Sequence, residues 1–209
     1  VAAYLSVGSK AAGFVGLLVV CYQAFAAVPE IWGPILWILA VASMTICNLG
    51  ALKQTNIVRL LGYSSIAHGG FILVPFAMAA SYDSIGLADA FFGSITYLLI
   101  YAAMNLGAFA VIIAVARKTR SAEISSMGGL FNYMPGLTVA MTIFLASLTG
   151  IPPLGGWYAK FSVWSALIGA DTGLGYAMAV IMALNTVVAA YYYLNVAKTM
   201  WFDPVPDGE

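Results

Sequence analysis

One long apolar stretch, residues 136–168, constrains this chain more than any other feature of its sequence. It contains 33 residues and would measure about 50 Å as one straight helix, whereas a bilayer core of about 30 Å needs only about 20 residues. Its middle reads Gly150-Ile151-Pro152-Pro153-Leu154-Gly155-Gly156, and the prolines lack the N–H groups that a continuous helix requires. We therefore predict two half-helices joined by an unwound segment over 150–156.

Lys160 follows this break and is the single charge in the stretch. Irregular backbone at membrane depth persists only inside protein or beside water, and in transporters such breaks mark ion-handling sites. The alternative is a buried proline kink whose lysine extends its ammonium group to the interface. Lys160 lies eight residues before the end of the stretch, among Trp157, Phe161 and Trp164, which argues against that alternative.

The composition is that of an integral membrane protein. Hydrophobic residues make up 63% of the chain, charged residues 8%, and the mean hydropathy is +0.97, values that a soluble core does not need. The formal net charge is zero, so nothing indicates nucleic-acid binding. One histidine excludes a histidine-based metal cluster, and Cys21 and Cys47 lack metal-like or redox-like spacing. We expect no metal site and no cofactor site in this chain, and no covalent catalysis.

Six apolar spans can be placed, so the predicted fold class is all-α, a polytopic transmembrane helix bundle with one broken helix. The predicted spans are 2–27, 34–52, 61–80, 90–116, 136–168 and 175–197, with breakers between them such as Pro29, Pro34, Gly62, Pro135, Gly173 and Gly175. The chain begins at Val1 inside an apolar run, which predicts a piece of a longer membrane protein.

The charges between spans predict the topology. Six spans place on one side the connections that carry Lys53, Arg59, Arg117, Lys118, Arg120 and Lys198. The other side carries Glu30, Asp83, Asp89 and Asp171. By the positive-inside rule the basic loops are cytoplasmic. Aromatic residues near the span ends fit interfacial belts; these are Trp32, Trp37, Tyr191, Tyr192, Tyr193 and Trp201.

Lys10 and Lys160 are the two basic residues inside predicted spans. A charged lysine at the membrane centre costs about 2.5–3.5 kcal/mol on insertion scales, so each must face water, find a partner or lose its proton. His68, in the third span, can accept and donate a proton near neutral pH. We therefore predict that Lys10, His68 and Lys160 form a proton or cation relay. The alternative for His68 is a core residue whose hydrogen bonds are satisfied.

Uncharged polar residues form stripes that could line a hydrated path beside this relay. Spacings of three, four or seven residues place each stripe on one helical face. The stripes and single positions are Ser6; Ser64 and Ser65; Ser94, Tyr97, Tyr101 and Asn105; Thr138, Thr142 and Thr149; and Thr45, Asn48 and Asn185. The alternative is hydrogen bonding between neighbouring helices, which contributes about 0.6 kcal/mol per bond in membranes.

Several stretches resemble the antiporter-like membrane subunits of respiratory complex I, the NADH–quinone oxidoreductase. They are the run from Asn48 to His68, NLGALKQTNIVRLLGYSSIAH; the break Gly150–Gly156 followed by Lys160-Phe161; and Ser9-Lys10. Gly62-Tyr63-Ser64-Ser65, and a lysine rather than a glutamate after the break, are most similar to the N branch of the family. Val58-Arg59 departs from the family's Lys-Arg; it is expected in a loop, without effect on the relay.

The resemblance implies a fourteen-span protein built from two inverted five-span repeats. Residues 1–27 would be the last span of the first repeat, 34–197 the second repeat, and 198–209 a cytoplasmic loop. Lys160 would load protons in the second half-channel, Lys10 would link the two half-channels, and His68 would lie between them.

The resemblance also implies the setting in which these residues would work. FMN, iron–sulfur clusters and quinone would belong to other subunits, and the partners would be membrane subunits of complex I, including neighbouring antiporter-like ones, in a bacterial inner membrane. One alternative is a multisubunit Na+/H+ antiporter, which shares these motifs. The other alternative is a purely structural subunit. Two buried lysines and the intact helix break argue against it.

Overall fold

The computed structural model describes residues 2–81 and 84–206, and these residues form helices and one isolated β-bridge. The predicted all-α fold is therefore confirmed. The elements are α1 (Ala2–Tyr4), η1 (Leu5–Ser9), α2 (Lys10–Val19), η2 (Val20–Ala24), α3 (Pro29–Ala51), α4 (Ile57–Ala77), η3 (Ala79–Ser81), α5 (Ser84–Thr119), η4 (Ile124–Met127), α6 (Leu130–Tyr133), α7 (Pro135–Thr149), α8 (Gly155–Gly169) and α9 (Gly173–Phe202). Asp83 and residues 207–209, which figured in the predicted topology and loop, lie outside the described residues.

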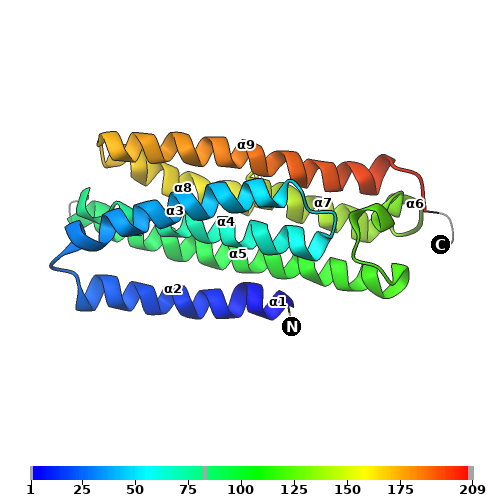
Figure 1. Ribbon diagram of the computed structural model, residues 1–209, viewed down its shortest axis with the longest axis horizontal. Coiled ribbons are helices and arrows are strands. Elements are labelled where there is room, and N and C mark those ends of the chain that lie inside the picture. Colours follow the sequence, from blue (N-terminus) through cyan, green and yellow to red (C-terminus); the bar gives the residue numbers. More distant parts are fainter. Residues whose placement is uncertain (1, 82–83, 207–209) are drawn as a thin grey trace.

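Five helical segments of the described chain are long and apolar enough to cross a membrane: Leu5–Ala24, Pro29–Ala51, Ile57–Ser81, Ala88–Thr119 and Gly173–Phe202. The sixth predicted span is divided into the two 15-residue helices α7 and α8. They run roughly end to end along the bundle, with α9 beside them (Figure 1).

Three predicted boundaries were wrong. Helix α3 begins at Pro29, a position at which the missing N–H has no helical partner to lose, and Pro34 lies inside the helix. Helix α4 begins at Ile57. The Asn56 side chain accepts hydrogen bonds from the backbone N–H groups of Val58 and Arg59, so Asn56 is a standard N-cap. Val58 therefore lies in a helical first turn and not in a loop, and Gly62 lies within the helix. Helix α9 continues to Phe202, so Lys198 is helical.

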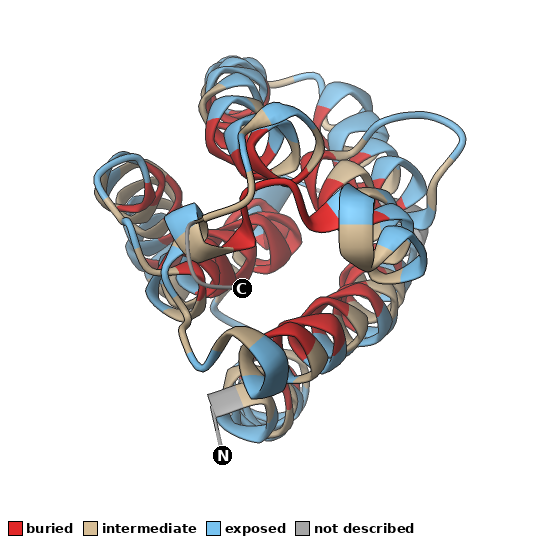
Figure 2. Ribbon diagram, turned by 90° about the vertical axis from the view of Figure 1, so that its right-hand side faces the viewer, coloured by how far each residue is buried: buried red, intermediate tan, exposed pale blue. Residues whose placement is uncertain are grey.

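Helix α4 is the centre of the bundle. In its apolar window 67% of the residues are buried, against 17–50% in the other four candidate spans. Viewed end on, buried residues face the middle of the bundle and exposed residues line its outside (Figure 2). Outward-facing side chains such as Ile38, Leu99 and Val187 are 64–69% exposed, as expected where lipid or another protein covers the surface.

The connections at the basic end are tied together by backbone hydrogen bonds. The α3–α4 connection pairs with the segment after α5 through Ile57 N–H to the Ala122 carbonyl (2.9 Å) and Ile124 N–H to the Thr55 carbonyl (2.8 Å). The end of α9 joins the η4–α6 turn through Gly129 N–H to the Thr199 carbonyl (3.3 Å). The basic connections therefore lie at one end of the bundle, together with the end of α9 (Figure 1).

Candidate functional site

The break between α7 and α8 covers residues 150–154 and follows from local chemistry. Gly150 ends α7 in a left-handed conformation (φ +94°), which glycine adopts without steric cost. Pro152 and Pro153 then offer no N–H, and their peptide bond is cis. The predicted break was too long, because Gly155 and Gly156 are the first two residues of α8.

Gly156 serves close packing rather than unwinding. A Cβ atom there would lie 1.7 Å from the Ser147 carbonyl oxygen, a contact that no side chain can make. The Gly156 N–H also donates to the Ser147 hydroxyl (3.1 Å), which gives a partner to one of the free N–H groups at the start of α8. The first turn of α8 is thereby held against the last turns of α7.

This packing brings the Lys160 side chain back to the end of α7. Its ammonium group donates to the Thr149 carbonyl at 2.8 Å, and the side chain is 9% exposed. Carbonyls in the last turn of a helix lack helical partners and carry the negative end of the helix dipole. The break therefore creates the acceptor that Lys160 uses.

Lys160 also lines a cleft of about 310 Å³ between α8 and α9. Its other lining residues include Trp157, Phe161, Trp164 and Thr186. The indole of Trp164 donates to the Ala179 carbonyl of α9 at 3.2 Å, which connects the two helices at this cleft. The aromatic residues that surround Lys160 in the sequence are thus its neighbours in space as well.

Lys10 takes part in a second polar cluster, between the first helical segment, α4 and α5. Its ammonium group donates to the Ser65 hydroxyl, to which the Tyr101 hydroxyl also donates (2.9 Å). The Ser65 hydroxyl donates to the Ser6 carbonyl (3.4 Å), and the Asn105 amide donates to the Ser6 hydroxyl (2.9 Å). Ser6 lies in the π-helical turn η1, directly before Lys10, and such turns are frequent at functional sites.

His68 forms the centre of a third cluster and is 2% exposed. Its Nδ1 lies 2.9 Å from the Tyr97 hydroxyl and its Nε2 lies 3.4 Å from the Tyr193 hydroxyl, which in turn contacts the Ser64 hydroxyl. A neutral imidazole donates through one nitrogen and accepts through the other, while a tyrosine hydroxyl can do either. Each member of this chain can therefore pass on a proton.

The three clusters are adjacent. The His68 ring lies 5.1 Å from the ring of Tyr101, which belongs to the Lys10 cluster. On the other side, the His68 ring lies 5.9 Å from the Phe71 ring, and the Lys160 ammonium group lies 5.0 Å from the centre of that same ring. The structure thus brings Lys10, His68 and Lys160 into one region around α4, where His68 and Lys160 are buried and Lys10 is half-buried.

Not every predicted path residue belongs to these clusters. Thr142 donates to the Thr138 carbonyl (2.8 Å) and accepts from the Trp201 indole (2.9 Å), so its hydroxyl connects α7 with α9. The Thr149 hydroxyl is bonded to the Leu145 carbonyl (2.8 Å), and Thr149 contributes its backbone carbonyl to Lys160 instead.

The sequence reasoning missed Tyr192 and Tyr193. They were expected in an interfacial belt, but they are 4% and 1% exposed, whereas Tyr191 is 68% exposed. The Tyr192 hydroxyl donates to Asn48 (3.0 Å), whose amide donates to Asn185 (3.0 Å). The signal was available, because both tyrosines follow Asn185 by seven and eight residues and therefore share its helical face.

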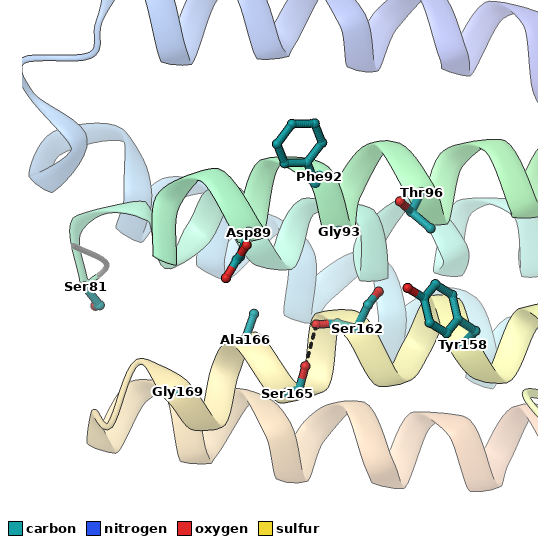
Figure 3. A pocket seen from close by; sticks show the side chains of 10 residues that line it. All are labelled: Ser81, Asp89, Phe92, Gly93, Thr96, Tyr158, Ser162, Ser165, Ala166 and Gly169. Atoms are coloured by element: carbon teal, nitrogen blue, oxygen red, sulfur yellow. Dashed lines mark hydrogen bonds between the residues drawn. The ribbon is translucent and has the colours of Figure 1, made fainter. Parts of the chain in front are cut away.

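A polar groove of about 600 Å³ lies between α5 and α8, away from the Lys160 cleft. Figure 3 shows Thr96 on α5 and Tyr158, Ser162 and Ser165 on α8 around it, with Asp89 toward the end where α5 begins. The groove thus lies in the acidic half of the bundle. No group of three or more metal-ligating side chains occurs among the residues the structure describes.

A family model described as "NADH:quinone oxidoreductase/Mrp antiporter, TM" matches residues 1–186. The chain belongs to this family. Among its members, the chain is 46% identical to an NADH-quinone oxidoreductase subunit N from Dehalococcoides mccartyi, over 95% of the chain and 40% of the relative. It is 43% identical to a subunit N from Trichlorobacter lovleyi, over 97% of the chain and 40% of the relative. The chain therefore spans about 40% of the length of these curated relatives.

Solved structures of the NADH:quinone oxidoreductase/Mrp antiporter family share the fold. The chain is similar to a chain of respiratory complex I from Thermus thermophilus, with a TM-score of 0.61 and 27% identity over 81% of this chain and 36% of that one. It is also similar to a chain of the Mrp complex from Dietzia sp., with a TM-score of 0.72 and 23% identity over 88% of this chain and 34% of that one. The latter likeness shows the fold alone.

Proposed function

We propose that this chain is part of a proton-translocating membrane subunit of NADH–quinone oxidoreductase. The observation that carries the proposal is the convergence of half-buried Lys10 and buried His68 and Lys160, from three different helices, in one polar region around α4. Ionisable groups inside a membrane bundle are costly and therefore rare, and where they occur they mark ion or proton pathways. The relatives named as subunit N support this complex over others.

In the proposed mechanism the chain's own residues hold and pass protons. Lys160 holds a proton on its ammonium group, which the free Thr149 carbonyl stabilises. His68 exchanges protons through its two tyrosine partners, and Lys10 exchanges them through the Ser65 and Tyr101 hydroxyls. Electron transfer through FMN, iron–sulfur clusters and quinone takes place in other subunits, and this chain binds none of these groups. Its partners are the neighbouring membrane subunits.

We further propose that the protein lies in a bacterial inner membrane with the basic end of the bundle in the cytoplasm. Lys53, Arg59 in the first turn of α4, and Arg120 lie together at that end, and the positive-inside rule gives its side. The groove beside Asp89 then faces the opposite compartment, and its hydroxyl groups provide hydrogen-bond partners for water.

A second candidate is a subunit of a multisubunit cation/proton antiporter, because the family model that matches residues 1–186 also describes Mrp antiporters. The discriminating experiment uses the assembled complex with the full-length subunit in sealed vesicles. NADH-driven proton uptake is measured with a pH-sensitive dye in sodium-free buffer and again with added sodium. We expect equal uptake in both buffers. Uptake that depends on sodium would instead support the antiporter.

A further inference from the structure

Phe71 of α4 occupies the junction between Lys160 and the His68 cluster. Its side chain is 1% exposed. The Lys160 ammonium group lies 5.0 Å from the centre of its ring. The ring is stacked on that of Tyr97, the hydrogen-bond partner of His68, at 6.3 Å between centres and 10° between planes. One apolar ring therefore contacts both sides of this junction.

The hydrogen-bonded connections stop at this ring. Among the described residues, the Lys160 ammonium group has one hydrogen-bond partner, the Thr149 carbonyl, which cannot accept a proton for onward transfer. The hydroxyl and imidazole groups on the other side bond to one another. Among the described residues no hydrogen bond connects these two sides, so a direct transfer between Lys160 and His68 needs a bridging water molecule beside the Phe71 ring.

The ring also interacts favourably with the lysine in its charged form. A cation over an aromatic face is attracted by the ring quadrupole, most strongly where water is absent. A phenyl ring cannot take the proton itself. Phe71 thus stabilises the charged lysine without giving it a route to His68.

We propose that Phe71 is the gate between Lys160 and His68: its closed ring blocks direct proton exchange, and exchange requires the ring to move and admit water. The inference rests on the proposed function and adds a barrier to the relay. Phe71 is therefore a positioning residue: its ring controls whether water reaches the space between Lys160 and His68, and the ring itself carries no proton.

The test removes the barrier and measures the backward leak of protons. Phe71→Ala is introduced into the full-length subunit of the assembled complex, in sealed membrane vesicles. NADH builds a pH gradient that is followed with a pH-sensitive dye, and its decay is timed after NADH is exhausted. We expect decay at least about tenfold faster than in the wild type, which corresponds to a barrier lower by about 1.36 kcal/mol. Phe71→Leu, which keeps most of the bulk, should restore slow decay.

The matched control is Phe76→Ala. Phe76 lies on the same helix and is 0% exposed, but its ring contacts Tyr22 rather than Lys160 or His68. This variant creates a similar cavity outside the relay and should retain slow decay. If Phe71→Ala prevents assembly, Phe71→Val, which removes less of the side chain, takes its place and should still leak faster than Phe76→Ala. Equal decay in the Phe71 and Phe76 variants would overturn the gate.

Lys160→Ala in the same vesicles separates this inference from the proposed function. If Lys160→Ala abolishes proton uptake while the Phe71 variants keep slow decay, the gate is wrong and the relay stands. If Lys160→Ala takes up protons like the wild type, the relay itself is wrong.

Discussion

At the residue scale, two ionisable groups of this chain are stabilised by different kinds of partner. Lys160 donates to a backbone carbonyl that the helix break leaves free, and this acceptor stabilises the charged form of the lysine. His68 is held by the hydroxyls of Tyr97 and Tyr193, which can reverse donor and acceptor roles as the imidazole changes its proton. The carbonyl can only accept a hydrogen bond, whereas the hydroxyls can also pass a proton on.

Tyr193→Phe should therefore slow proton translocation without preventing assembly. The change removes the hydroxyl that reaches both Ser64 and His68 Nε2. Without this hydroxyl His68 loses one of its two proton-exchange partners, so we expect a loss of roughly tenfold in the initial rate of NADH-driven proton uptake, which corresponds to a barrier higher by about 1.36 kcal/mol. Tyr191→Phe is the control, since this neighbouring tyrosine is 68% exposed. Equal rates in the two variants would contradict a role for Tyr193.

The sequence predicted which residues are ionisable and buried, but not all of their partners. Lys10, His68 and Lys160 stand out because a charge or an imidazole within an apolar span is costly and therefore rare. Tyr193 did not stand out in the sequence, because the last span was expected to end at 197 and a tyrosine near a span end fits an interfacial belt. Helix α9 continues to Phe202, which places Tyr193 more than two turns inside the helix.

At the element scale, the broken helix depends on how closely α8 approaches α7. The Gly150-Ile151-Pro152-Pro153 sequence was sufficient to predict the break, because glycine readily adopts non-helical backbone angles and proline lacks the N–H that a helix needs. Its length was overestimated, since the role of Gly156 depends on Ser147, a neighbour that only the folded structure reveals. Sequence alone therefore locates the break but does not separate unwinding glycines from packing glycines.

Gly156→Ala should destabilise the subunit, because the added methyl group would overlap the Ser147 carbonyl. Overpacking of this kind costs about 1–3 kcal/mol and forces backbone shifts, here between α7 and α8. The expected result is a lower melting temperature of the purified complex, together with weaker proton translocation. Gly169→Ala is the matched control on the same helix, since a Cβ atom there meets nothing within 4 Å. An unchanged melting temperature for Gly156→Ala would refute the packing role.

The groove between α5 and α8 should admit water. In a background without Cys21 and Cys47, Thr96→Cys places a thiol in the groove, whereas Ala108→Cys places one on the same helix at a fully buried position. A membrane-impermeant thiol reagent should label the former and not the latter, and only from the acidic side. Labelling of neither would show that the groove is closed in the assembled complex.

At the scale of the whole molecule, the bundle has an apolar core that encloses the polar clusters around α4, and two ends of opposite charge character. The basic connections meet at one end, through the contact of residues 55–57 with 122–124 and through the packing of the end of α9 on α6. Hydropathy and charge placement were enough to predict this organisation, because each span and each connection carries its own signal. The rotation of each helix about its axis was not predictable, as Thr142 shows.

The orientation of the bundle can be tested with single cysteines at its two ends, in the same cysteine-free background. Arg120→Cys lies at the basic end, and Asp171→Cys lies in the connection between α8 and α9; both positions are exposed. An impermeant thiol reagent should label the first only in inside-out vesicles and the second only in intact cells, as the positive-inside rule requires. The reverse pattern would contradict the proposed orientation.

The central claim is that Lys160 belongs to a path that moves protons, and the most direct measurement pairs quinone reduction with proton uptake. Both activities are followed in membranes that contain Lys160→Ala or Lys160→Arg in the full-length subunit, with exposed Lys53→Ala as the control. We expect both activities to fall in Lys160→Ala while the complex remains assembled, and to be unchanged in the Lys53 variant. Lys160→Arg should also be impaired, because a guanidinium group does not release its proton. Wild-type proton uptake in both Lys160 variants would contradict the account.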